Sequence, residues 1–358
     1  MSLHQLECEG YGLITLYRLI AILLGRLHMT TEEALETYDQ VAETLFSRSN
    51  RKISSSAQFK ATTLEDVVKQ IVSRRTDDDL LRSRDGSQRK GKAFVCAIDE
   101  TELGSIHRLR SYDTNDESPD EWLRDCKIWE AARATTAAPL NFKAMTIQRG
   151  PTKRSFVDAA LGYNNPAEQL LDEACNVYHK ERTLGALVSL GTGTRKLSLA
   201  NPEEVSGASY IASVGATLKN EATDTERAHQ RIKGRFKRCP DTYYRFNVPD
   251  AADEVKLAEW KKMEELKAMT MDYVRDEAVD RRINDLVDLL SNKKKPEGLT
   301  LKYIGMFPSS ELGSRYFLTT QRPPVRQKGF PEGFTASTAY GLVKQFLRRE
   351  RECTGILR

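Results

Sequence analysis

Residues 156–166 read FVDAALGYNNP, and residues 187–193 read LVSLGTG. The second stretch lies in a short apolar run that ends at the turn Gly191-Thr192-Gly193, which is the pattern of a buried strand. In the first stretch Asp158 follows two apolar residues, as an aspartate does where a strand ends and the side chain caps the next turn. Each stretch therefore predicts a strand end followed by a turn.

Strand and helix patterns alternate around these two stretches. Residues 94–98 (FVCAI) form another apolar run of the buried type. Apolar residues at helical spacing predict a helix over residues 64–72, and a second one runs from Trp122 to Thr136, where Pro139 stops it. Buried strands that alternate with helices predict an α/β fold, a three-layer sandwich with a mainly parallel central sheet.

Two helices are expected near the N-terminus. Residues 11–27 are apolar nearly all round, but Arg18 interrupts them and the run is shorter than the roughly 20 residues of a membrane span, so a buried helix is expected. Thr30 and Glu33 have the spacing of a capping box, and they precede a helix of one apolar face that extends to residue 46.

The composition argues against nucleic-acid and metal binding. Lys and Arg total 55 against 51 acidic residues, so the net charge of +4 is too small for a nucleic-acid footprint. The 6 cysteines are widely spaced without a CxxC pair, which predicts reduced thiols in a cytoplasmic protein. No histidine shows metal spacing or the context of a catalytic triad (His4, His28, His107, His179, His229).

Three segments in succession resemble the patatin-like phospholipase family. Residues 127–139 (KIWEAARATTAAP) resemble the helix that precedes the family's catalytic aspartate. Residues 156–166 resemble the aspartate motif with its Asn-Asn-Pro, and residues 187–193 resemble the strand and turn that follow. The resemblance continues upstream to residue 19 and downstream to residue 290, and thus covers most of the chain.

The resemblance implies a serine-type lipid acyl hydrolase, a phospholipase or an acylglycerol lipase, that needs no cofactor and no metal. Asp158 would be the proton acceptor of a Ser and Asp dyad, and the substrate would be a lipid or phospholipid acyl ester. The order of the segments places Asp158 beside the N-terminus of the helix at residues 19–27. Peripheral contact with membranes follows from such a substrate.

The resemblance also suggests a division of the chain. We expect a patatin-like domain over residues 1–250, incomplete at its N-terminal end, and a helical extension over residues 251–292. A basic linker and tail would follow over residues 293–358. The lysine run Lys293-Lys294-Lys295 is typical of a solvated linker, and it could also rest on anionic lipid.

The family's nucleophile is missing from its expected place. The family carries its serine on a Gly-x-Ser-x-Gly elbow, whereas the residues before Leu19 are Gly12-Leu13-Ile14-Thr15-Leu16-Tyr17-Arg18. The aspartate is followed by Ala159 and Ala160 instead of the usual glycine. We therefore expect no acyl-ester hydrolysis through Asp158. The alternatives are a lipid-binding or regulatory pseudoenzyme and a truncated gene product.

Overall fold

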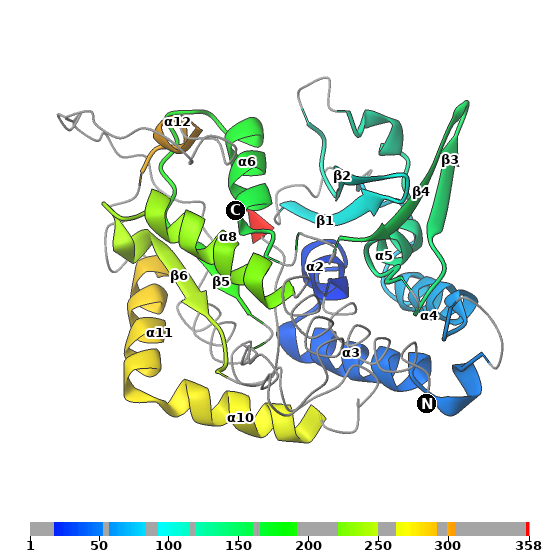
Figure 1. Ribbon diagram of the computed structural model, residues 1–358, viewed down its shortest axis with the longest axis horizontal. Helices are drawn as coiled ribbons and strands as arrows, with labels where there is room; N and C mark the ends of the chain where they lie inside the picture. Colours follow the sequence, from blue (N-terminus) through cyan, green and yellow to red (C-terminus); the bar gives the residue numbers. More distant parts are fainter. Residues whose placement is uncertain are drawn as a thin grey trace, which may run out of the picture.

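The computed structural model describes residues 18–52, 57–83, 92–114, 119–139, 141–159, 163, 165–191, 193, 221–249, 263–291, 299–305 and 356–357. Its main sheet has the strand order β2-β1-β4-β3 (Figure 1). The strands are β1 (Lys92–Asp99), β2 (Glu102–Arg110), β3 (Met145–Arg149) and β4 (Thr152–Asp158), and β7 (Ile356–Leu357) pairs with β1. A second sheet joins β5 (Leu187–Leu190) to β6 (Tyr243–Phe246).

The predicted parallel pairing of the central sheet is wrong for the described strands. Strand β1 runs antiparallel to β2 and to β4, and β3 runs antiparallel to β4. Among the strands that the structure describes, only β5 and β6 pair in parallel. The reason lies in the connections: β1 and β2 are joined through Glu100 and Thr101, and β3 and β4 through Gly150 (φ 55) and Pro151. Such short connections allow antiparallel pairing alone, because a parallel pair needs a crossover of a dozen or more residues.

Helices lie on both faces of the main sheet, as the layered prediction requires. On one face α2 (Leu19–Gly25), α3 (Thr31–Leu45), α4 (Ala61–Ser73) and α5 (Ile128–Thr135) share a core with the strands (Figure 1). On the other face α6 (Ala167–Val177), α8 (Glu221–Arg235) and α12 (Leu301–Gly305) build a second core together with β5 and β6.

The alternation of side chains along β1 separates the two cores. Val95 and Ala97 point into the core with α2 to α5, whereas Phe94, Cys96 and Ile98 point into the core with α6 and α8. All five side chains are buried. The sheet is therefore covered on both faces, which explains why residues 94–98 are an uninterrupted apolar run.

The N-terminal helices match their predicted places. Helix α2 buries nearly every side chain, and residues 11–17 of its predicted range lie outside the described residues. Helix α2 approaches β1 so closely that a Cβ at Gly25 would lie 2.3 Å from Ala93 Cβ. In α3 the capping box is confirmed, since Thr30 Oγ1 accepts from the Glu33 amide and Glu33 accepts from the Thr30 amide.

Two other segments differ in extent from their sequence patterns. The helix expected from Trp122 to Thr136 is divided into the 3₁₀ turn η4 (Glu121–Leu123) and α5. The sequence of residues 242–248 alternates like a half-exposed strand, whereas the structure has the shorter and mostly buried β6 there. Two further 3₁₀ turns are η2 (Arg48–Asn50) and η5 (Pro240–Thr242).

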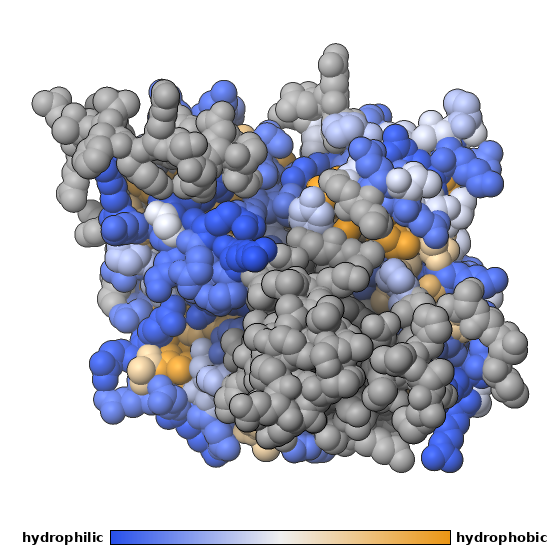
Figure 2. All heavy atoms as spheres, in the orientation of Figure 1, coloured by the Kyte–Doolittle hydropathy of each residue, from blue (hydrophilic) through white to orange (hydrophobic). Residues whose placement is uncertain are grey.

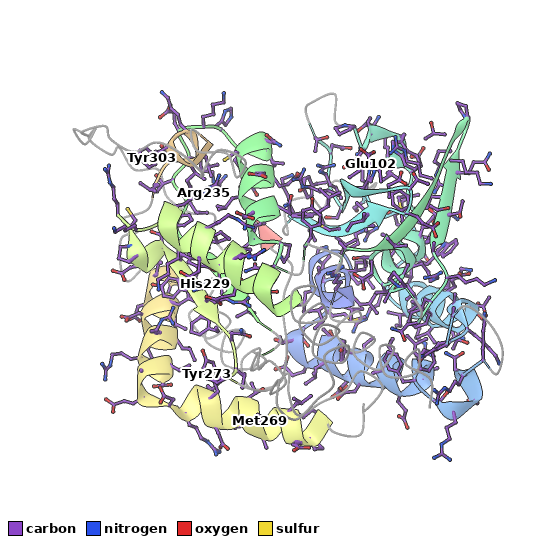
Figure 3. All side chains as sticks on the ribbon, in the orientation of Figure 1. Glu102, His229, Arg235, Met269, Tyr273 and Tyr303 are labelled. Carbon is purple, nitrogen blue, oxygen red and sulfur yellow. The ribbon has the colours of Figure 1, made fainter. Side chains whose placement is uncertain are left out.

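The helices after residue 262 pack on the smaller sheet. Helices α10 (Met263–Arg275) and α11 (Glu277–Leu290) bury Val274, Ile283 and Leu286 against Tyr244 and Phe246 of β6. Hydrophilic side chains dominate the face seen in Figure 2, where apolar residues appear in small patches. Figure 3 shows Met269 and Tyr273 on α10, and Tyr273 Oη accepts from the Asn247 amide at 3.3 Å.

Candidate functional site

Asp158 is the last residue of β4 and lies in the interior of the protein. Its side chain is 0% exposed, and its backbone amide donates to the Ala137 carbonyl at 3.0 Å. Ala137 follows α5, so the segment predicted to precede the aspartate holds the strand end in place. The side chain of Thr135 strengthens this contact, because its hydroxyl donates to the Cys96 carbonyl of β1 at 2.7 Å.

The N-terminus of α2 lies directly beside Asp158, as the sequence predicts. The residue that meets the carboxylate there is Arg18, the N-cap of α2, whose Nη1 donates to Asp158 Oδ1. Arg18 is 2% exposed, so both partners of this ion pair are buried. A buried pair of this kind is held by mutual attraction that offsets the loss of hydration of both charges.

The second and third motifs also meet in space. Asn165 Oδ1 accepts from the Ala167 amide at the start of α6 and from Ser189 Oγ of β5, at 3.2 and 3.3 Å. Arg245 of β6 donates to Ser189 Oγ at 2.9 Å. Ser189 is buried and carries these two bonds, so it is poorly placed to substitute for the missing nucleophile.

The glycine turn after β5 has a structural cause. A Cβ at Gly191 would lie 2.0 Å from Asn247 Oδ1, closer than any side chain tolerates. The same oxygen accepts from the amide of Gly193 at 2.8 Å, and Gly193 adopts φ 109, a conformation that favours glycine. The turn is therefore the tight connection that the sequence predicts.

A sequence profile described as patatin-like phospholipase matches residues 18–171. The matched stretch contains Arg18, α5 and the Asp158 strand end, and it ends inside α6. Residues 18–171 form a patatin-like phospholipase domain.

Relatives of this patatin-like domain carry names of the same class. Calcium-independent phospholipase A2-gamma of Mus musculus is 27% identical over 304 residues, which are 82% of this chain and 37% of that protein. Patatin-like phospholipase 1 of Plasmodium falciparum is 28% identical over 218 residues, 52% of this chain and 31% of that protein. Intracellular phospholipase A2 of Caenorhabditis elegans is 26% identical over 179 residues. The chain thus spans about 37% or less of the length of these relatives.

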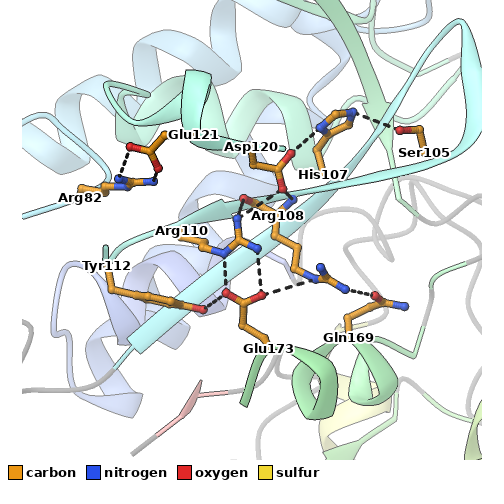
Figure 4. A network of polar contacts seen from close by, with 10 residues as sticks. All are labelled: Arg82, Ser105, His107, Arg108, Arg110, Tyr112, Asp120, Glu121, Gln169 and Glu173. Atoms are coloured by element: carbon orange, nitrogen blue, oxygen red, sulfur yellow. Dashed lines mark hydrogen bonds and ion pairs between the residues drawn. The ribbon is translucent and has the colours of Figure 1, made fainter. Parts of the chain in front are cut away.

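The structure also contains an interior polar network that sequence reasoning missed. Figure 4 shows Arg110 of β2 paired with Glu173 of α6, which also accepts from Tyr112 Oη at 2.8 Å. Glu173 is 0% exposed. Burial raises the pKa of Tyr112, and the Glu173 charge raises it further, so the phenol stays protonated as a donor. The network links the edge strand of the sheet to α6.

The other end of the network contains a buried histidine with two polar neighbours. His107 Nδ1 lies 2.6 Å from Asp120 Oδ1, and its Nε2 lies 3.4 Å from Ser105 Oγ (Figure 4). Sequence spacing suggested no triad context for any histidine, and it gave no indication of these partners of His107. The alternating run Ser105-Ile106-His107 was the available signal, because residues two apart on a strand share a face.

Asp120 is held in its charged form by several donors. Burial by itself raises the pKa of Asp120, but hydrogen bonds from His107 and from the Arg108 amide outweigh burial, and the pKa lies below its usual value. Its Oδ2 receives the Arg108 amide at 2.9 Å and Arg110 Nη1 at 3.3 Å. The carboxylate therefore presents Oδ1 to His107 in a fixed position.

In the part of the chain that the structure describes, no three residues among His, Cys, Asp and Glu are grouped so that they could hold an ion. The described helices also include none with the length and apolarity needed to cross a membrane.

Proposed function

We propose that this chain is a lipid-binding member of the patatin-like phospholipases whose Asp158 does not perform acyl-ester hydrolysis. The observation that carries the proposal is the buried ion pair between Arg18 and Asp158. In the resemblance on which the site rests, Asp158 serves a serine hydroxyl at the N-terminus of this same helix. Here a guanidinium lies against the carboxylate.

The ion pair opposes the chemistry of a general base in two ways. A guanidinium stabilises the negative charge of a carboxylate and so opposes the uptake of a proton from a nucleophile. It also occupies the position within hydrogen-bond reach of Asp158 Oδ1 that a general base must keep for its substrate proton. In addition, residues 12–18 offer no serine. The serine of the family's dyad is therefore missing from this segment, and the aspartate is paired with Arg18 instead.

The proposed ligand is a phospholipid or another lipid acyl ester. Support comes from the family of the domain and from relatives that are named phospholipases. We place the protein in the cytoplasm, in peripheral contact with membranes, and Cys96 and Cys126 are buried free thiols in keeping with a reducing compartment.

Binding and hydrolysis are tested on the same vesicles. The full chain is incubated with phosphatidylcholine vesicles, flotation measures bound protein, and mass spectrometry measures released fatty acid. We expect flotation of the wild type and no fatty-acid release that depends on Asp158. The matched variants are Asp158→Asn and Arg75→Gln, the latter removing a partly exposed ion pair with Glu33.

Two results contradict the proposal. Fatty-acid release by the wild type that disappears in Asp158→Asn shows a working dyad and makes the chain an acyl hydrolase. A folded wild type that stays at the bottom of the gradient, with neutral vesicles as well as anionic ones, contradicts lipid binding.

A further inference from the structure

Ser105, His107 and Asp120 form a row at the edge strand β2, where His107 pairs with Ala97 and lies on the same face of the sheet as the core with α2 to α5. His107 Nδ1 contacts Asp120 Oδ1 at 2.6 Å, and His107 Nε2 contacts Ser105 Oγ at 3.4 Å. His107 and Asp120 are both 4% exposed, whereas Ser105 is half-buried and so reaches the surface. The three side chains thus connect the buried carboxylate of Asp120 to the accessible hydroxyl of Ser105.

The surroundings fix the tautomer and the orientation of the imidazole. A charged carboxylate only accepts hydrogen bonds, so Nδ1 carries the proton, and the lone pair of Nε2 is shared by the Ser105 hydroxyl and Arg154 Nη1, each 3.4 Å away. The ring is held edge-on against Phe156, with centroids 5.3 Å apart, and Phe156 stacks on Trp122. This is the arrangement in which an imidazole acts as general base toward a serine.

The backbone around Ser105 is irregular in a way that suits a reactive hydroxyl. The pairing of β1 with β2 shifts register between Ile98 and Asp99, whose partners are Ile106 and Glu102. Residues 103–105 therefore stand opposite no residue of β1 in the described ladder. Bulged strands redirect side chains and leave amides outside the ladder, and such amides are potential donors to a developing oxyanion.

A cationic side chain beside the imidazole defines the class of substrate. Arg154 Nη1 lies 3.4 Å from His107 Nε2 and 3.2 Å from Asp99 Oδ2, and its side chain is 40% exposed. A half-exposed guanidinium at the mouth of the row favours a ligand with a negative group near the reacting carbon. Because a guanidinium only donates hydrogen bonds, its contact with Nε2 also agrees with the tautomer in which Nδ1 carries the proton.

We propose that Ser105, His107 and Asp120 form a second, surface nucleophilic site that cleaves small anionic acyl esters. Ser105 Oγ attacks the carbonyl carbon, and its proton passes to His107 Nε2. The ester C–O bond breaks, and the leaving alcohol takes that proton. A water then attacks the acyl group, gives one proton to His107 and releases the carboxylic acid, while Ser105 Oγ takes the proton back. This site does not depend on Asp158 or on the proposed lipid binding.

The test is active-site labelling of the full chain with a fluorophosphonate and peptide mapping of the adduct. In this probe the Ser105 oxygen forms a bond to phosphorus, fluoride leaves, and the serine proton leaves through His107. We expect an adduct on Ser105 in the wild type and none on that peptide in Ser105→Ala. In His107→Gln and Asp120→Asn the rate should fall about a hundredfold or more, which is the usual contribution of a general base. The control is Ser155→Ala on β4, whose hydroxyl bonds to Thr146 at 2.8 Å, and it should label like the wild type.

Circular dichroism on every variant separates loss of the base from loss of the fold. A folded wild type without an adduct on Ser105 overturns the proposal, and so does an adduct that forms at an unchanged rate in folded Asp120→Asn and His107→Gln. An adduct on a different serine that requires Asp158 contradicts the proposed function at the α2 site. If that adduct appears together with the Ser105 adduct, the second site stands and the proposed function fails.

Discussion

Replacing Arg18 by methionine would measure what the ion pair contributes to the fold. The substitution keeps an unbranched stem and removes the guanidinium, so the fully buried Asp158 carboxylate loses the charge beside it. Removing one partner of a buried pair typically costs about 3–5 kcal/mol. For a domain of about 150 to 250 residues this corresponds to a fall in Tm of about 6–20 °C. Urea unfolding followed by circular dichroism gives the free energy directly.

A double-variant cycle makes the measurement specific to the pair. Asp158→Asn alone leaves Arg18 buried without its counter-charge, whereas Arg18→Met with Asp158→Asn removes both charges, so the double variant should lose about 1–3 kcal/mol less than the sum of the single losses. The exposed pair of Arg75 with Glu33 is the control, and Arg75→Met should cost less than about 1 kcal/mol. A loss below about 1 kcal/mol in Arg18→Met, or strict additivity in the cycle, would refute the view that this pair replaces the dyad.

Further predictions concern the glycine turn and the capping box. Gly191→Ala should cost about 1–3 kcal/mol because its Cβ would meet Asn247 Oδ1 at 2.0 Å, whereas Gly234→Ala in α8, with nothing within 4 Å, should be neutral or stabilising; equal unfolding midpoints would contradict this. Arg75 and the capping amide hold the pKa of Glu33 below its usual value of 4.5, so its stabilisation is complete above that pH and is lost as the pH falls through the lower folded pKa. As the pH falls through the folded pKa of Glu33, the stability difference between wild type and Glu33→Gln should disappear. A difference that persists at pH 2 would contradict this prediction.

The fold was predictable where a strand is buried on both faces. Residues 94–98 and 186–190 contain little but apolar side chains, and both are strands in the structure. Strand β2 was not predictable in this way, because it places His107 and Arg110 in the interior among partners from distant segments. A charged residue in a strand pattern indicates a solvated face until its partner is known.

The direction of the strands was not encoded in their apolar content. Parallel and antiparallel central strands bury similar side chains, and what decides between them is the length of each connection. The Gly150 turn between β3 and β4 is a local signal of a hairpin. This signal is hard to recognise in the sequence, because polar residues alternate through the flanking residues 145–158.

Only part of the candidate site could be predicted from the sequence. The motif around Asp158 identified the aspartate and its neighbouring helix, because order along the chain places the two elements together. The side chain that meets the carboxylate could not be predicted, because Arg18 and Asp158 are 140 positions apart in the sequence. In the sequence, Arg18 marks only an interruption in an apolar run. Pairing across such a separation is a product of the packed fold.

Both hydrophobic cores depend on strand β1. Because the side chains of residues 94–98 alternate between opposite cores, neither core is complete without β1. Amides in the middle of β1, at Cys96 and Ala97, should therefore exchange with deuterium only when the whole protein unfolds, whereas those of α11, which belongs to neither core, can exchange through local opening. We therefore expect the two cores to unfold in a single transition. A fragment that lacks residues 92–99 should keep neither core intact.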